Sequence, residues 1–77
     1  MRIKVLAFGK IADVLRRPEQ DIQGPETVAQ LRVFLEKEYP ELKTFHYLVA
    51  VNRQAAEEDT PLSENAEVAL LPPFSGG

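Results

Sequence analysis

The chain has 77 residues and a net charge of −3 at pH 7, with 44% hydrophobic and 27% charged residues, values typical of one small globular domain. Acidic and basic residues are interleaved, and no apolar run approaches the roughly 20 residues of a membrane span; we therefore expect a cytoplasmic protein that binds neither nucleic acid nor membranes. The absence of cysteine excludes a disulfide framework, a thiolate nucleophile and a cysteine-ligated metal.

The N-terminal residues 2–8 show the alternation of a strand. One face of this strand carries the apolar residues Ile3, Val5 and Ala7. The opposite face changes from polar to apolar along the strand and ends with Phe8. A single helix of about 12 residues covers only one face of a sheet. The apolar end of the second face is therefore expected to stay exposed unless a partner covers it.

Two short elements follow this strand. Ile11, Val14 and Leu15 stand at helical spacing and predict one or two helical turns, which Pro18 ends. Residues 19–23 predict an edge strand.

The main helix is predicted to begin at Thr27, with Gln30 completing a capping box, and to end at or before Tyr39 because Pro40 follows. Its apolar stripe consists of Val28, Leu31, Leu35 and Tyr39, with Phe34 beside it. Its solvent face is expected to carry Gln30, Arg32, Glu36 and Lys37.

The second half of the chain predicts two more strands. Residues 47–51 form a buried strand that turns at residues 52–53, and residues 57–59 form an acidic loop. A later turn places Asn65 in the left-handed conformation, and residues 67–71 form a final buried strand. The predicted order is strand, strand, helix, strand, strand, which is an α+β domain.

Conventional catalytic sites are absent from the sequence. It has no glycine-rich phosphate loop, no pair of histidines at metal-binding spacing and no plausible catalytic triad. The single histidine, His46, is expected to be structural or exposed. The acidic run 57–59 lacks the glycine and the ligand spacing of a calcium loop, and Arg16 and Arg17 are better explained as a solvated pair than as a site for phosphate or an acidic partner. We expect a chain that binds no metal and no cofactor and is no enzyme on its own.

The last six residues, Pro-Pro-Phe-Ser-Gly-Gly at 72–77, are typical of an extended functional tail. The two prolines remove two backbone donors and hold φ at about −65°, so a strand cannot continue past Leu71. At about 3 Å per residue the tail reaches on the order of 20 Å. At its tip, the last two residues, Gly76 and Gly77, carry no side chain beside the terminal carboxylate. The alternative is a frayed terminus, the usual state of chain ends.

These residues resemble a known family. The ending LLPPFSGG, the opening IKVLAFGKIADVL and the pattern of Thr27, Val28 and Leu31 at the helix start are similar to the MoaD branch of the MoaD/ThiS ubiquitin-like sulfur carriers, the small subunits of molybdopterin synthase. The resemblance implies a β-grasp fold, with a mixed sheet of four to five strands packed on one main helix and the first and last strands side by side at its centre. It divides the chain into a domain at 1–71 and the tail at 72–77.

The resemblance also implies a function. A ubiquitin-activating-type enzyme uses ATP to adenylate Gly77, sulfur from a donor protein converts it to a thiocarboxylate, and this terminus gives its sulfur to the pterin precursor in the large catalytic subunit. Gly76 fits a channel too narrow for a side chain. The remaining predicted partner-binding residues are Phe8, Leu71, Pro72, Pro73, Phe74 and Ser75. Phe74, Ala12 and Ala55 depart from the family pattern, which leaves the detailed partner contacts open.

Three alternatives stay open. In the first, a sulfur carrier for tRNA thiolation or thiamin synthesis uses the same C-terminal Gly77. In the second, a ubiquitin-like modifier uses it and ends as an isopeptide on a lysine. A passive β-grasp adaptor binds through its sheet and leaves the tail unused.

Overall fold

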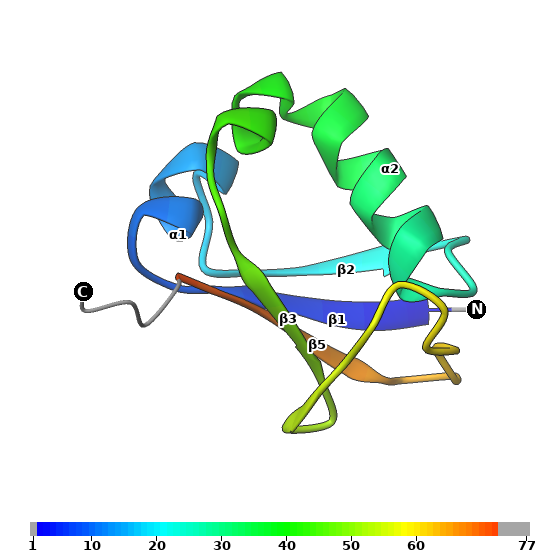
Figure 1. Cartoon of the computed structure of the whole chain (residues 1–77). Coiled ribbons are helices and arrows are strands. Elements are labelled where there is room, and N and C mark those ends of the chain that lie inside the picture. Colours follow the sequence, from blue (N-terminus) through cyan, green and yellow to red (C-terminus); the bar gives the residue numbers. More distant parts are fainter. Residues whose placement is uncertain (1, 73–77) are drawn as a thin grey trace.

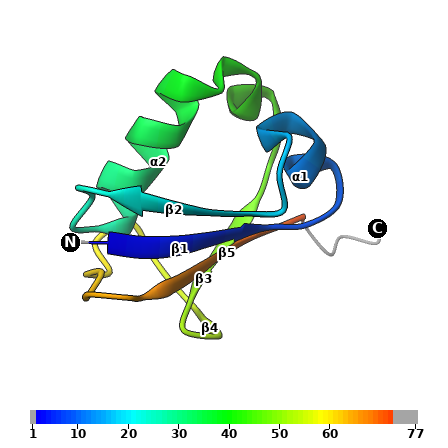
Figure 2. The ribbon, with the colours of Figure 1, turned by 180° about the vertical axis from the view of Figure 1, so that it is seen from behind.

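In the computed structural model, which describes residues 2–72, five strands form one mixed sheet with the order β2-β1-β5-β3-β4 (Figure 1). The strands are β1 (Arg2–Ala7), β2 (Glu19–Gln23), β3 (Leu48–Val51), β4 (Gln54–Ala55) and β5 (Glu67–Leu71). The helices are α1 (Gly9–Leu15), α2 (Val28–Glu38) and the 3₁₀ helix η1 (Pro40–Thr44). Figures 1 and 2 show all three helices on the same side of the sheet.

The centre of the sheet is the parallel pair β1 and β5, in which Val5 faces Val68 and Ala7 faces Leu70. The other strand pairs are antiparallel, so the sheet is mixed, as the resemblance implies. Every second residue of these strands points toward the helices, and the alternation predicted for residues 2–8 is confirmed. The buried core consists of Ile3, Val5, Ala7, Ile11, Leu15, Ile22, Val28, Leu31, Leu35, Leu42, Tyr47, Val49, Leu62, Ala66, Val68 and Leu70.

Helix α2 has the predicted start and end. The side-chain oxygen of Thr27 accepts a hydrogen bond from the backbone N–H of Gln30 (3.2 Å). The side chain of Gln30 accepts one in return from the N–H of Glu26 (2.8 Å), one residue earlier than in the usual capping box. At the other end, the N–H of Tyr39 donates to the carbonyl of Leu35. Proline disfavours helical geometry in the residue before it, so α2 ends before Tyr39, and Pro40 begins η1.

The loop after β4 supports the start of α2. The N–H groups in the first turn of a helix have no partner within the helix. Here the N–H of Val28 donates to the carbonyl of Thr60 (3.0 Å), and that of Ala29 donates to the carbonyl of Glu58 (2.8 Å). The acidic run is exposed, as expected, and its backbone caps the main helix.

Several sequence-based predictions are wrong in detail. Residues 47–51 are not buried throughout, since the side chain of Leu48 is 48% exposed. The strand at residues 2–8 ends at Ala7, and Phe8 is instead the N-cap of α1. Neither β4 nor η1 was expected. Both lack an apolar pattern. Strand β4 forms because β3 supplies its partner, and η1 packs through a single buried residue, Leu42.

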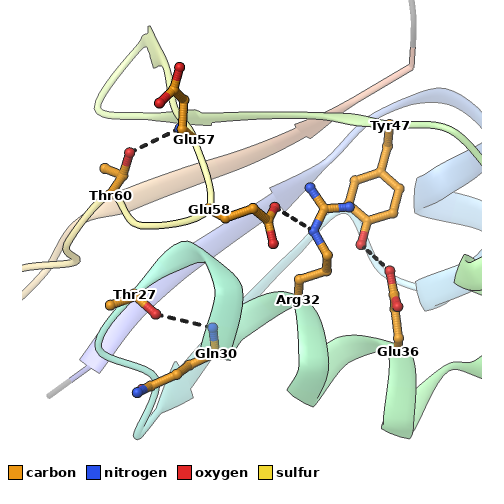
Figure 3. Close-up of polar contacts among 8 residues, drawn as sticks. All are labelled: Thr27, Gln30, Arg32, Glu36, Tyr47, Glu57, Glu58 and Thr60. Atoms are coloured by element: carbon orange, nitrogen blue, oxygen red, sulfur yellow. Dashed lines mark hydrogen bonds and ion pairs between the residues drawn. The ribbon is translucent and has the colours of Figure 1, made fainter.

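Arg32 and Glu36 do not lie in open solvent, contrary to the prediction. They belong to a polar cluster with Tyr47 and Glu58, called here the Tyr47 cluster (Figure 3). The hydroxyl of Tyr47 donates to Oε2 of Glu36 (2.8 Å), and the Arg32 guanidinium lies 4.8 Å from the centre of the Tyr47 ring. Arg32 Nε in turn donates to Oε2 of Glu58 (2.8 Å). The cluster therefore joins α2 to the start of β3 and to the acidic loop.

Burial raises the pKa of the Tyr47 hydroxyl well above its usual value, and the hydrogen bond to Glu36 acts in the same direction, while Arg32 opposes them. Above pH about 10 the unfolded chain releases this proton while the folded chain keeps it. The unfolded state then binds fewer protons, so stability falls as pH rises. Below that pH the contribution of Tyr47 is fully present.

We predict that the free energy of unfolding of the unmodified chain falls more steeply above pH about 10 than that of Tyr47→Phe, by up to about 1.4 kcal/mol per pH unit. Urea unfolding across that range measures both slopes. Tyr39→Phe is the matched control, because no side-chain hydrogen bond of Tyr39 is found within residues 2–72. Parallel curves for the unmodified chain and Tyr47→Phe would contradict the buried, protonated state of Tyr47.

Candidate functional site

The face of the sheet turned away from the helices is apolar at one end. In register across four strands, Leu6 faces Ala69, Ala69 faces Ala50, and Ala50 faces Ala55. Leu48 faces Leu71 in the adjacent position. These side chains are exposed or half-buried and alternate with the buried core residues. Leu6, Leu48, Ala50, Ala55, Ala69 and Leu71 are called here the open face.

Charged residues border this face at the start of β5, and Glu19, which faces Leu6, borders it along β2. Lys4 Nζ lies 3.4 Å from Glu19 Oε2, and Arg53 Nε lies 3.7 Å from Glu67 Oε1. All four side chains are more than a third exposed, so the pairs contribute little to stability. The polar border leaves the apolar area concentrated where β5 ends.

Phe8 extends the apolar area by one residue. Its backbone is still extended (φ −128°, ψ 154°), and its N–H donates to the carbonyl of Leu70 (3.3 Å). The side chain is 46% exposed, as the sequence predicted for this face. Because side chains alternate along an extended chain, Phe8 follows Leu6 on the side of the open face.

The root of the tail lies beside Phe8. Gly9 has φ +59°, a conformation that disfavours residues with a side chain, and this lets the chain turn directly from β1 into α1. A β-carbon at Gly9 would lie 3.5 Å from Cγ of Pro72, so Pro72 is next to this turn. The first residue after β5 thus leaves the domain between α1 and the apolar end of the open face.

The structure places only part of the predicted site. Phe8, Leu71 and Pro72 lie at the same end of the sheet, with Pro72 exposed. Pro73, Phe74, Ser75, Gly76 and Gly77 lie outside the described residues, and their roles stay predictions.

The two alanines that depart from the family pattern lie in different places. Ala55 is exposed on β4 and belongs to the open face. Ala12 is half-buried on α1 and packs against the core. Of the two, only Ala55 is available to a partner that covers the open face.

The sequence did not identify Leu48, Ala50 and Ala69 as surface residues. Residues 47–51 are apolar at both alternating sets of positions, so periodicity could not tell a half-exposed strand from a buried one. The small residues at 50, 55 and 69 were the available signal, because three alanines in register leave a flat surface.

Residues 2–72 contain no group of three or more histidine or acidic side chains that could hold a metal ion. No helix among them is long and apolar enough to cross a membrane. His46 is exposed, and Arg16 adopts a left-handed conformation (φ 65°) where it ends α1.

Comparison with known proteins gives one family match and several similar structures. The model of the ThiS family matches residues 5–77. The chain is 29% identical to a chain in the complex of subunits 1 and 2 of molybdopterin-converting factor from Helicobacter pylori, with a TM-score of 0.76 and 100% of both chains covered. It is 25% identical to SAMP1 from Haloferax volcanii, with a TM-score of 0.84 and again 100% of both chains covered.

A protein described as molybdopterin converting factor subunit 1 from Pyrococcus furiosus superposes with a TM-score of 0.88 at 23% identity, over 96% of this chain and 99% of that one. At this identity the likeness concerns the fold alone. Together with the mixed sheet around α2, it confirms the β-grasp fold.

Proposed function

The chain belongs to the ThiS family, whose fold is that of the ubiquitin-like sulfur carriers, and from this membership we propose that it carries sulfur as a thiocarboxylate on Gly77 for molybdopterin synthesis. The observation that supports this choice most is the similarity, over the full length of both chains, to a chain in the two-subunit molybdopterin-converting factor of Helicobacter pylori. The chain acts as the non-catalytic small subunit, and the large subunit performs the transfer.

The chemistry takes place at the terminal carboxylate. A free α-carboxylate is ionised at neutral pH and reacts poorly with nucleophiles. An adenylating enzyme joins a carboxylate oxygen to the α-phosphorus of ATP, and pyrophosphate leaves. Hydrosulfide supplied by a donor protein then attacks the Gly77 carbonyl and displaces AMP, which leaves the thiocarboxylate. The thiocarboxylate sulfur then bonds to a carbon of the pterin precursor in place of an oxygen, and water hydrolyses the resulting thioester, which leaves the sulfur on the pterin and restores the carboxylate.

The arrangement of the described residues supports docking through the open face. Its apolar end, with Phe8 and Leu71, lies where Pro72 leaves the domain. A subunit that covers this end therefore receives the tail directly. Ordering a residue costs about 1–2 kcal/mol of backbone entropy, and prolines at 72 and 73 reduce that cost because their φ is already fixed.

Two other functions of the same tip remain candidates. The similarity to SAMP1, a small archaeal modifier protein, at 25% identity supports a protein modifier that ends as an isopeptide. A carrier for tRNA thiolation or thiamin synthesis uses the same thiocarboxylate with a different acceptor. Reconstitution of the thiocarboxylated chain with a molybdopterin synthase large subunit and the pterin precursor tests the proposal. Sulfur appears in the pterin product if the proposal holds, and no transfer to pterin overturns it.

We predict that Phe8→Ala weakens binding of the large subunit by about 1 kcal/mol or more, the range of an interface anchor. Its effect on the free energy of unfolding is smaller, because Phe8 lies outside the buried core. Val33→Ala is the matched control, since Val33 is 68% exposed on α2, on the other side of the sheet. Titration calorimetry and urea unfolding give the two quantities. Unchanged affinity combined with lower stability would assign Phe8 to the fold instead.

We predict that Gly76→Ala changes the free energy of unfolding by less than about 0.5 kcal/mol, as surface substitutions do. In a tight channel the added methyl group causes strain of roughly 1–3 kcal/mol. This corresponds to a loss of about ten- to a hundredfold in the rate of sulfur transfer. Single-turnover transfer by the thiocarboxylated variant measures this, with a chain lacking Gly77 as the inactive control. Full turnover by Gly76→Ala would contradict the narrow channel.

A further inference from the structure

The Tyr47 cluster is linked to the open face through a single peptide bond. Tyr47 is the residue before β3, and its side chain points toward α2 and is only 8% exposed. The next residue, Leu48, points to the opposite side, where it is 48% exposed and faces Leu71. Figure 3 shows Arg32 and Glu36 reaching Tyr47 from α2, and they lie on one face of the helix because they are four residues apart.

Leu48 needs such an anchor because its own strand supports it weakly. Strand β3 has four residues, and β4 pairs only with Ala50 and Val51. Among residues 2–72, Leu48 therefore has β5 on one side and no strand partner on the other. Residues 45–47, which precede it, belong to no helix or strand. A shift of one residue in register would exchange the two faces of β3 and bury Leu48.

The polar contacts of Tyr47 resist that shift. A hydrogen bond to a charged acceptor is stronger than one to a neutral group. The bond from the Tyr47 hydroxyl to Glu36 is of that kind and is partly buried, and the Arg32 guanidinium covers the ring. Arg32 is itself held by Glu58. A displaced Tyr47 would lose both the hydrogen bond and the contact with the cation.

We propose that Arg32 and Glu36 are positioning residues of the docking surface, which act through Tyr47 to hold Leu48 against Leu71 at the root of the tail. The surface that the large subunit covers is thus set from the opposite side of the sheet. The role of the partner rests on the proposed function, whereas the ordering of Leu48 is a property of the chain alone.

The test uses the full chain and two readouts. Hydrogen exchange of the free protein, followed on peptides that cover residues 45–51 and 67–72, reports local opening of β3 and β5. Binding to the large subunit and the transfer rate at saturating large subunit separate docking from chemistry. The variants are Tyr47→Phe and Glu36→Ala, with Glu36→Gln as the conservative variant, because glutamine keeps an acceptor oxygen. Tyr39→Phe is the matched control.

We expect Tyr47→Phe and Glu36→Ala to speed exchange in these two segments by about tenfold, the equivalent of one charge-assisted hydrogen bond, while exchange in the first turns of α2 changes less. Affinity for the large subunit falls, and the transfer rate at saturation stays the same. Glu36→Gln shows smaller changes in both exchange and affinity than Glu36→Ala, and Tyr39→Phe changes neither.

Two results would overturn the proposal. Uniformly faster exchange over the whole chain would make the cluster a contributor to global stability only. Faster local exchange with unchanged affinity would show that Leu48 does not shape the docking surface. If the unmodified chain binds no large subunit at all, the proposed function fails, and the exchange data still decide whether Glu36, acting through Tyr47, orders Leu48.

Discussion

The parallel pairing of β1 with β5 is the constraint on which the rest of the structure depends. Strands that run in the same direction end at the same edge of the sheet, so the ends of β1 and β5 lie together. After β1, the positive φ of Gly9 turns the chain away into α1. After β5, Pro72 leaves beside that turn. A terminal strand in the middle of the sheet thus gives the tail a rigid root.

The second consequence is a sheet with one uncovered side. The helices α1, α2 and η1 all pack on the same side, which leaves no helix within residues 2–72 for the other. Alanines at 50, 55 and 69 keep that side flat, and Leu6, Leu48 and Leu71 make it apolar. An apolar surface next to a tail root suits a partner that acts on the tail, and this is why docking and chemistry belong together in the proposed function.

The local signals in the sequence predicted most of the fold. Thr27 with Gln30, the proline at 40 and the left-handed Asn65 each mark a boundary that depends on neighbouring residues alone, and all three are found where expected. The errors concern long-range contacts. Arg32 and Glu36 were predicted to face solvent because the sequence does not show that their partner, Tyr47, packs against them from another part of the chain. The exposure of Leu48 depends on which strands flank β3, and periodicity along β3 does not contain that information.

The candidate site shows the same difference between local features, which the sequence predicts, and long-range contacts, which it does not. The sequence predicted the exposure of Phe8, because the change from polar to apolar along residues 2–8 is a local feature, whereas the functional tail that it also predicts lies beyond Pro72, outside the described residues. It missed the alanines of the open face and the support that α2 gives to Leu48, since both arise only when strands from distant parts of the chain come together.

The central claim is that Gly77 carries sulfur, and the mass spectrum of the C-terminal peptide from the chain isolated from its cells tests it most directly. We expect a terminal glycine in which sulfur has replaced one carboxylate oxygen, and we expect this sulfur to be missing when the adenylating enzyme is absent. A terminus found only as the free acid, or joined to a lysine of another protein without any thiocarboxylate, would contradict it.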